Sequence, residues 1–221
     1  MGLLALFAYL WFRSPAEIDP HTLPLMVIGI MAMLCAPMEL ARNLFGFDGY
    51  GFRVYRFAGV PARTMLLGKY LALLPLFSLL AGAVLTVSAL LQSMLPTHIL
   101  GTVLQGGIVF MACCMVGGEF SLSSPQAVSP TSPVNRTGCA TAFLLLLARL
   151  VVTATLILVA WPAIAVERKL VEAGHAFPVY LLLSMIEFGL AIIAFRPWLG
   201  RQARALDERS DNILEAVSVT E

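Results

Sequence analysis

The sequence predicts an all-α polytopic membrane protein with five complete transmembrane helices and one partial helix at its N-terminus. Of its 221 residues, 59% are hydrophobic and only 12% are charged. An average soluble domain has about 25% charged residues, so this chain has too little charge to cover a water-exposed globule. The apolar residues also gather in runs of about 20, the length that a helix needs to cross a bilayer.

The apolar runs place the elements in order along the chain. The first run, residues 1–12, covers only about 18 Å as a helix, so it is expected to be the end of a longer helix. The complete spans are expected at residues 22–42, 70–92, 98–118, 139–162 and 177–196. Together they make a transmembrane domain at residues 1–198, which a charged tail at residues 199–221 follows.

The positions of the Lys and Arg side chains predict the orientation of these helices. If the segment 43–69 is cytoplasmic and the helices alternate in direction, the cytoplasmic side holds ten of these residues. The opposite side then holds only Arg13, Arg168 and Lys169. Because positive residues accumulate in cytoplasmic loops, the C-terminus is expected to be cytoplasmic.

Composition and motifs exclude several classes of function. A total of 14 Lys+Arg against 13 Asp+Glu lacks the basic excess of a nucleic-acid-binding protein. Gly68-Lys69 resembles the end of a phosphate-binding loop, but Arg63 and Tyr70 stand where that loop needs Gly and Ser or Thr. The chain therefore lacks an ATP site of its own and is not expected to be an enzyme. Its His and Cys residues lack the spacing of metal ligands, so neither a metal nor a cofactor is expected.

Two charged residues, Arg149 and Glu187, fall within predicted spans. Each lies about ten residues from the end of its run, which is about 15 Å deep in a helix. The two helices follow each other along the chain, so they are expected to be neighbours. We favour a structural Arg149–Glu187 ion pair that allows both charges to be buried. The alternative is a polar element of a substrate path, because intramembrane charge is often functional.

The segment 43–69 combines aromatic residues, Arg and Gly. This composition is typical of a segment at the membrane–water interface. We expect a short helix within residues 51–58. Asp48 would cap its start, and Pro61 would end it.

The same segment resembles a known family. The stretches that carry the resemblance are Asn43-Leu44-Phe45-Gly46-Phe47-Asp48-Gly49, Gly51-Phe52-Arg53, Val60-Pro61 and Leu66-Leu67-Gly68-Lys69. They are similar to the cytoplasmic segment of bacterial ABC transporter permeases of the type-2 exporter class, and the helix order of residues 22–196 fits loosely. Two positions depart from that pattern, because Tyr70 and Glu119 stand where related sequences carry Asn.

The resemblance implies a membrane-spanning permease subunit, the C-terminal half of a longer exporter, in the lipid bilayer of the bacterial inner membrane. It would move an unknown substrate, driven by a separate ABC ATPase subunit, together with a second permease half or copy. The implied ATPase-docking residues are Asn43, Phe45, Gly46, Asp48, Phe52, Arg53, Tyr55, Arg56, Pro61 and Lys69. The alternative is a membrane scaffold or assembly protein without a transport role. Co-purification with an ATPase whose hydrolysis rate the chain alters would separate the two.

Overall fold

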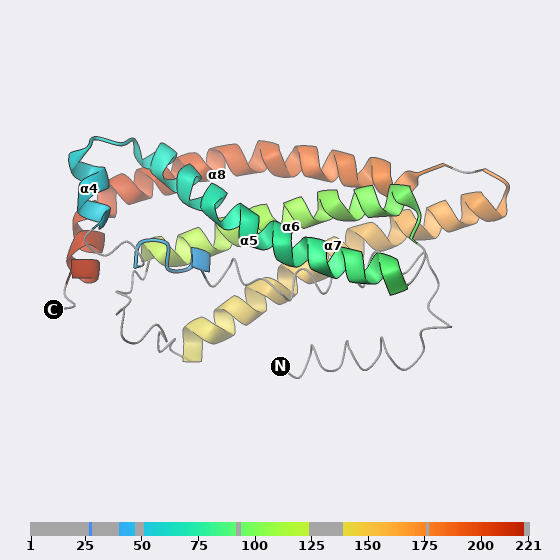
Figure 1. Ribbon diagram of the computed structural model, residues 1–221, viewed down its shortest axis with the longest axis horizontal. Coiled ribbons are helices and arrows are strands. Elements are labelled where there is room, and N and C mark those ends of the chain that lie inside the picture. The colour runs from blue at the N-terminus through green and yellow to red at the C-terminus, as the bar shows by residue number, and fades with distance from the viewer. Residues whose placement is uncertain are drawn as a thin grey trace. The chain divides into compact units, whose positions relative to one another are not determined.

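The described part of the chain is built from helices. The computed structural model describes residues 27, 40–46, 51–91, 94–123, 139–175 and 177–218, and it has no strand in these ranges. The helices are α4 (Gly51–Phe57), α5 (Ala62–Leu91), α6 (Pro96–Ser123), α7 (Cys139–Glu172) and α8 (Val179–Ser218) (Figure 1). The predicted all-helical class is confirmed for these residues.

Four of these helices are long and apolar enough to cross a membrane. The candidate spans are Ala62–Leu90, Pro96–Ser123, Leu146–Glu172 and Val179–Leu214. The predicted count of five is therefore not reproduced among the described residues. The partial helix at residues 1–12 lies outside them, and so does the predicted span 22–42 apart from residues 27 and 40–42.

The helices are longer than the apolar runs that predicted them. α5 begins at Ala62 instead of residue 70, α7 ends at Glu172 instead of residue 162, and α8 continues from its apolar part to Ser218. Helical hydrogen bonds join backbone groups, so a helix can continue through polar residues after its apolar run has ended. Prolines lie inside three of the helices, at Pro75, Pro162 and Pro197.

Two glycines end helices. Gly59 follows α4 with a φ of 64°, and Gly174 follows α7 with a φ of 84°. In both turns the next N–H donates to the carbonyl five residues back, from Val60 to Tyr55 and from His175 to Leu170. This is the Schellman arrangement, which places a glycine in the left-handed region just after the helix.

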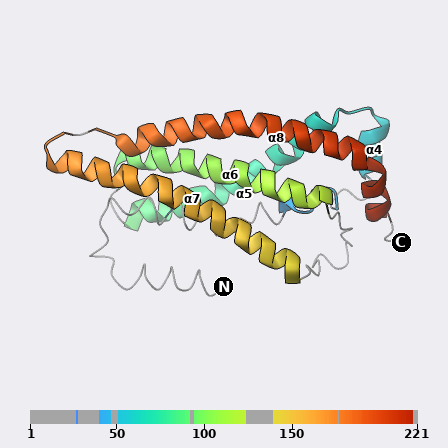
Figure 2. The ribbon, with the colours of Figure 1, turned by 180° about the vertical axis from the view of Figure 1, so that it is seen from behind.

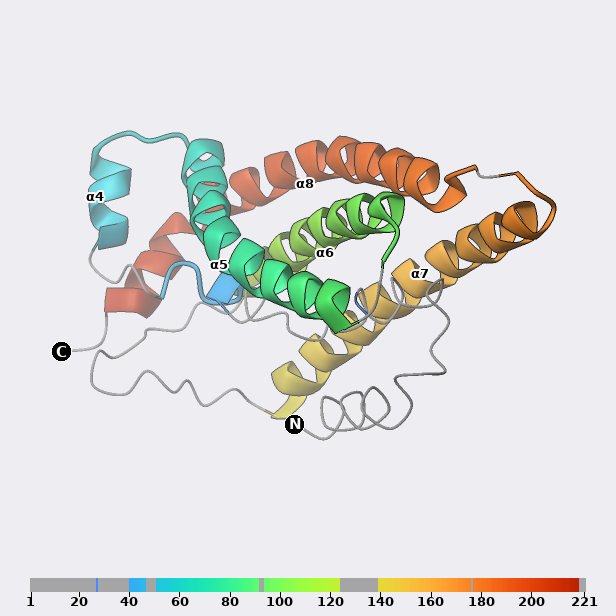
Figure 3. The ribbon, with the colours of Figure 1, turned by 45° about the vertical axis from the view of Figure 1, so that its right-hand side comes forward.

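The expectation that Pro61 ends α4 is wrong, because Gly59 ends it. Pro61 instead comes directly before α5, and its carbonyl accepts the N–H groups of Thr64 and Met65 at 2.9 and 3.1 Å. Figure 3 shows the turn from α4 into α5. Proline suits a helix start because the first N–H groups have no partner within the helix.

The described helices contribute to two compact units. Unit 1 combines residues 78–109 with residues 147–191, and unit 2 combines residues 36–77 with residues 110–146 and 192–221. Unit 1 therefore contains the end of α5, the beginning of α6, most of α7 and the beginning of α8. Unit 2 contains α4, the beginning of α5, the end of α6, the beginning of α7 and the end of α8.

In unit 1, α6 and α8 lie side by side (Figure 2). Gly101 and Gly107 of α6 face aromatic rings of α8, and an added Cβ would lie 2.5 Å from the ring of Tyr180 and 2.6 Å from that of Phe188. Small residues allow membrane helices to approach closely. These two glycines therefore set the separation of α6 and α8 in this unit.

Unit 2 has a hydrophobic core to which the C-terminal part of α8 contributes. Leu199, Ala203, Leu206 and Ile213 of α8 are buried in one cluster with side chains from the turn at residues 44–45, α4, α5 and α6. Residues 199–218, which make up most of the predicted charged tail, are thus the last half of a continuous helix, and the apolar face of this part is packed.

Many large apolar side chains remain exposed on the long helices. Leu79 and Leu90 of α5, Leu158 of α7 and Ile193 of α8 are each at least two-thirds exposed. Soluble monomers rarely expose contiguous apolar patches beyond a few hundred Å². Exposed apolar helix faces of this kind suit contact with lipid chains or with other apolar helices.

Candidate functional site

The candidate site is the corner that α4 makes with the preceding turn and the beginning of α5. α4 has two contrasting faces, which follow from its sequence. Phe52 is 1% exposed, whereas Val54, Tyr55 and Phe57 are 67%, 43% and 90% exposed. Arg53 is also exposed. A seven-residue helix cannot be stable by propensity alone, so its buried face must hold it in place.

Phe52 supplies that anchor. Its ring packs edge-on against the ring of Phe45, with centroids 5.3 Å apart and planes at 70°. Both rings belong to the buried cluster of unit 2, together with Leu206 and Ile213 of α8. The aromatic residues of the segment therefore have different roles, because Phe45 and Phe52 form core while Tyr55 and Phe57 remain at the surface.

Lys69 joins α5 to the turn before α4. Its Nζ donates a hydrogen bond to the Leu44 carbonyl at 2.8 Å. The same ammonium lies 5.2 Å from the ring centroid of Phe45 and 5.9 Å from that of Tyr55. Cations are attracted to aromatic faces within about 6 Å, so Lys69 helps to hold the turn, α4 and α5 together.

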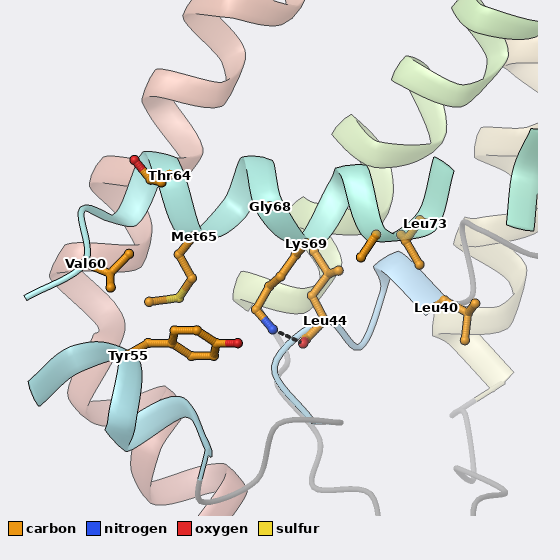
Figure 4. Close-up of a pocket in the computed structure, with 10 residues that line it drawn as sticks. Leu40, Leu44, Tyr55, Val60, Thr64, Met65, Gly68, Lys69 and Leu73 are labelled. Carbon is orange, nitrogen blue, oxygen red and sulfur yellow. Dashed lines mark hydrogen bonds between the residues drawn. The ribbon is translucent and has the colours of Figure 1, made fainter. Parts of the chain in front are cut away.

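A cavity of about 540 Å³ lies at this corner. Figure 4 shows Tyr55 reaching into it from α4, Leu40 and Leu44 on the opposite side, and Met65, Gly68 and Lys69 on α5. The remaining lining residues are Val60, Thr64, Ala72 and Leu73. Apart from the Lys69 ammonium and the hydroxyls of Tyr55 and Thr64, the lining side chains are apolar.

The other residues of the predicted docking set have varied surroundings. Asn43 and Gly46 are buried, and both polar atoms of the Asn43 amide lack a hydrogen-bond partner within the described part of the chain. Pro61 is exposed at the start of α5. Asp48 and the side chain of Arg56 lie outside the described residues, so the capping role of Asp48 stays a prediction. The structure thus brings Phe45, Phe52, Tyr55 and Lys69 together.

A buried polar joint lies beside this corner in unit 2. The Tyr70 hydroxyl of α5 donates to Gln202 Oε1 of α8 at 2.8 Å, and Gln202 Nε2 donates to the Met115 carbonyl of α6 at 2.9 Å. A Cβ at Gly118 would overlap the Tyr70 hydroxyl and the Gln202 amide. Tyr70 is one of the two positions at which the sequence departs from the permeases that it resembles, and here it links α5 to α8.

Sequence reasoning missed a second polar group, in unit 1. His98 and Glu167 are 1% and 4% exposed, and His98 Nε2 lies 2.9 Å from Glu167 Oε1. Glu167 Oε2 also accepts the Tyr180 N–H at 2.8 Å, one of the N–H groups at the start of α8 that lack a helical partner. One carboxylate of α7 therefore contacts both α6 and α8. His98 and Glu167 are 69 positions apart, so no local motif indicates this pairing.

The polar contacts between α6 and α8 continue deeper into the candidate spans. The Tyr180 hydroxyl lies 3.3 Å from Thr102 Oγ1, and Gln105 Nε2 lies 3.3 Å from Ser184 Oγ. Gln105 Nε2 also donates to a carboxylate oxygen of Glu187. Glu187 thus has a partner on α6 that the sequence did not indicate. The side chain of Arg149 lies outside the described residues, so the Arg149–Glu187 pair stays a prediction.

The described residues define the class of the chain as a helical protein, and they include four helices that are long and apolar enough to span a membrane. In the part of the chain that the structure describes, no group of three His, Cys, Asp or Glu residues is placed to hold a metal ion. Comparisons with protein-family models, with curated proteins and with solved structures found no match.

Proposed function

We propose that the chain is the membrane-spanning permease subunit of an ABC exporter in the bacterial inner membrane, and that α4 docks a separate ATPase subunit. The observation that carries the proposal is the two-faced character of α4. Phe52 fixes one face in the core, and the exposed surface of the helix presents Arg53 and Phe57. Aromatic residues and Arg are the residues that most often dominate the energy of protein–protein interfaces.

The packing of α4 agrees with the orientation expected from the charges. Phe52 of α4 shares a buried cluster with Leu206 and Ile213, close to the C-terminal end of α8. The proposal needs α4 close to this end of α8, because a docking helix and a cytoplasmic C-terminus must lie on the same side of the membrane. The shared cluster supports that arrangement. In this proposal the permease supplies the pathway and the docking surface, a second permease half or copy completes the pathway, and the ATPase supplies the chemistry.

The experiment is to purify the tagged chain from its native membranes and to measure ATP hydrolysis by the complex. A permease should co-purify with an ATPase subunit and change its hydrolysis rate. Phe57→Ala should weaken that association, because it removes the most exposed ring of α4 without touching the core. Phe143→Ala is the matched control, since Phe143 is an exposed phenylalanine on α7.

Two results would contradict the proposal. One is a stable complex that lacks any ATPase, which would favour the scaffold or assembly function. The other is an ATPase complex in which Phe57→Ala and Phe143→Ala behave alike, which would remove α4 as the docking element. Phe52→Ala is less informative, because the loss of a buried ring lowers stability as well.

A further inference from the structure

We propose that the cavity between α4 and the beginning of α5 is a binding site for one acyl chain of an anionic membrane phospholipid, with the lipid phosphate beside Lys69. The proposal goes beyond ATPase docking and does not depend on it. It rests on the apolar lining of the cavity, on the charge within that lining and on the position of the cavity beside a candidate membrane span.

The lining suits a hydrocarbon chain. Leu40, Leu44, Val60, Met65 and Leu73 form apolar walls around a volume of about 540 Å³. Ligand pockets in proteins have volumes of about 300–1,000 Å³ and are lined mainly by apolar side chains. A headgroup without a chain would leave these walls without an apolar partner, so the lining selects a ligand with an apolar tail.

The polar groups at the cavity suit an acidic headgroup. Lys69 contributes an ammonium group, and Tyr55 and Thr64 contribute hydroxyls that can donate hydrogen bonds. None of the ten lining residues is acidic. This combination complements a lipid phosphate better than a cationic or neutral group.

The position of the cavity favours a bilayer lipid as the source of the chain. Met65, Gly68, Lys69, Ala72 and Leu73 belong to the candidate span Ala62–Leu90. Leu67, Leu71 and Leu74, on the same stretch of α5, are exposed apolar side chains. Exposed apolar side chains of this kind suit contact with lipid chains, so this stretch of α5 lies where acyl chains are available. Basic residues at the end of a membrane helix are typical of anionic lipid recognition.

Gly68 offers a direct test of the cavity. It lines the cavity, and an added Cβ there meets no atom within 4 Å. Gly68→Leu should therefore fill the space without displacing the backbone. Gly82→Leu is the matched control, because Gly82 lies on the same helix, also has no atom within 4 Å of an added Cβ, and is not part of the lining. Both substitutions raise helix propensity equally.

The experiment measures binding of dioleoyl phosphatidylglycerol and dioleoyl phosphatidylcholine to the purified full-length chain by native mass spectrometry. The parental protein should bind phosphatidylglycerol about fivefold more tightly, the effect of one lysine near a lipid phosphate. Gly68→Leu should lose this tightly bound lipid, whereas Gly82→Leu should keep it. Lys69→Gln should reduce the preference to about one, and Lys69→Arg should preserve it.

The results that would overturn part or all of the proposal are the following. Retention of the lipid by a folded Gly68→Leu variant would show that the cavity does not hold the chain. If that variant does not fold, as judged by circular dichroism and gel filtration, Ala72→Leu on the same wall decides the question in the same way. An undiminished preference in Lys69→Gln would remove Lys69 from headgroup recognition. Equal binding of both lipids by the parental protein would refute an anionic site.

Discussion

Gly118 is a position where a single methyl group tests the packing of unit 2. Its added Cβ would overlap the Tyr70 hydroxyl and the Gln202 amide, which are hydrogen-bonded to each other. We expect Gly118→Ala to lower the free energy of unfolding by about 1–3 kcal/mol, the usual cost of overpacking a core. Thermal unfolding in detergent measures the effect.

Gly200 provides the control for this prediction. It lies in α8, two residues before Gln202, and an added Cβ there meets no atom within 4 Å. Gly200→Ala should be neutral or stabilising, because alanine favours a helix over glycine by up to about 1 kcal/mol. A Gly118→Ala variant that melts at or above the temperature of Gly200→Ala would show that the joint tolerates a larger residue.

Glu167 and Glu172 are two acidic residues of α7 that should differ strongly in their effect on stability. Glu167→Ala removes the acceptor of the buried Tyr180 N–H and the partner of His98. A buried donor that loses its acceptor costs about 1–3 kcal/mol, so we expect at least that loss in the free energy of unfolding. Thermal or denaturant unfolding of the purified variants measures it.

Glu172→Ala serves as the comparison. Glu172 pairs with Arg168 at 3.2 Å, but both side chains are more than half exposed. Exposed ion pairs contribute about 0–1 kcal/mol, so this variant should unfold almost like the parental protein. Equal losses from the two variants would mean that the buried contacts of Glu167 add nothing to stability.

At the level of the elements, the sequence predicted the apolar core of each described long helix but not the ends. A run of apolar residues shows which part of a helix is covered by lipid or protein, but it does not show where the helix ends. α8, for example, continues through charged residues to Ser218. The short helix expected within residues 51–58 is confirmed by α4 at Gly51–Phe57. Its end was assigned to Pro61 instead of Gly59, because both residue types stop helices and only the backbone conformation distinguishes them.

Only part of the candidate site could be predicted, because composition does not show which side chains are buried by contacts with distant parts of the chain. The aromatic and basic composition of the segment 43–69 indicated a surface element, but it did not show which ring faces the core. Phe52 is buried because it meets Phe45 and the C-terminal part of α8, which is distant in sequence. The His98–Glu167 contact joins residues that are 69 positions apart, so no local pattern records it.

The predicted Arg149–Glu187 pair is a contact between α7 and α8 that charge reversal can test. Arg149→Glu or Glu187→Arg alone would bring like charges together in a medium of low dielectric, where repulsion is strong. We expect either single variant to lower expression and thermal stability, and the double variant Arg149→Glu/Glu187→Arg to recover most of the loss. Reversal of the exposed Arg168–Glu172 pair is the control and should change little.

A different result would assign Glu187 another role. Its carboxylate already accepts a hydrogen bond from Gln105, so a pair with Arg149 is not required to satisfy it. If the double variant is as damaged as either single one, the pairing is wrong. The polar contacts from Thr102 to Glu187 would then be candidates for a substrate path between α6 and α8.

For the whole molecule, the charge bias predicts which helix ends share a side of the membrane. In a variant without its native cysteines, new cysteines at Ala58 and Ser210 should react with an impermeant thiol reagent only from the cytoplasmic side. A cysteine at Glu172 should react only from the opposite side. Labelling of right-side-out and inverted vesicles measures this, and labelling of all three positions from one face would refute the topology.

The order of synthesis has a consequence for the core of unit 2. Leu44, Phe45 and Phe52 are made well before their buried neighbours Leu206 and Ile213, because Leu206 follows Phe52 by 154 positions in the sequence. The corner around α4 therefore cannot reach its final packing until Leu206 and Ile213 have been made, although the intervening helices can insert one after another. Nascent chains released before residue 206 should expose these rings to proteases and chaperones, so quality control can distinguish chains that contain the end of α8 from chains that lack it.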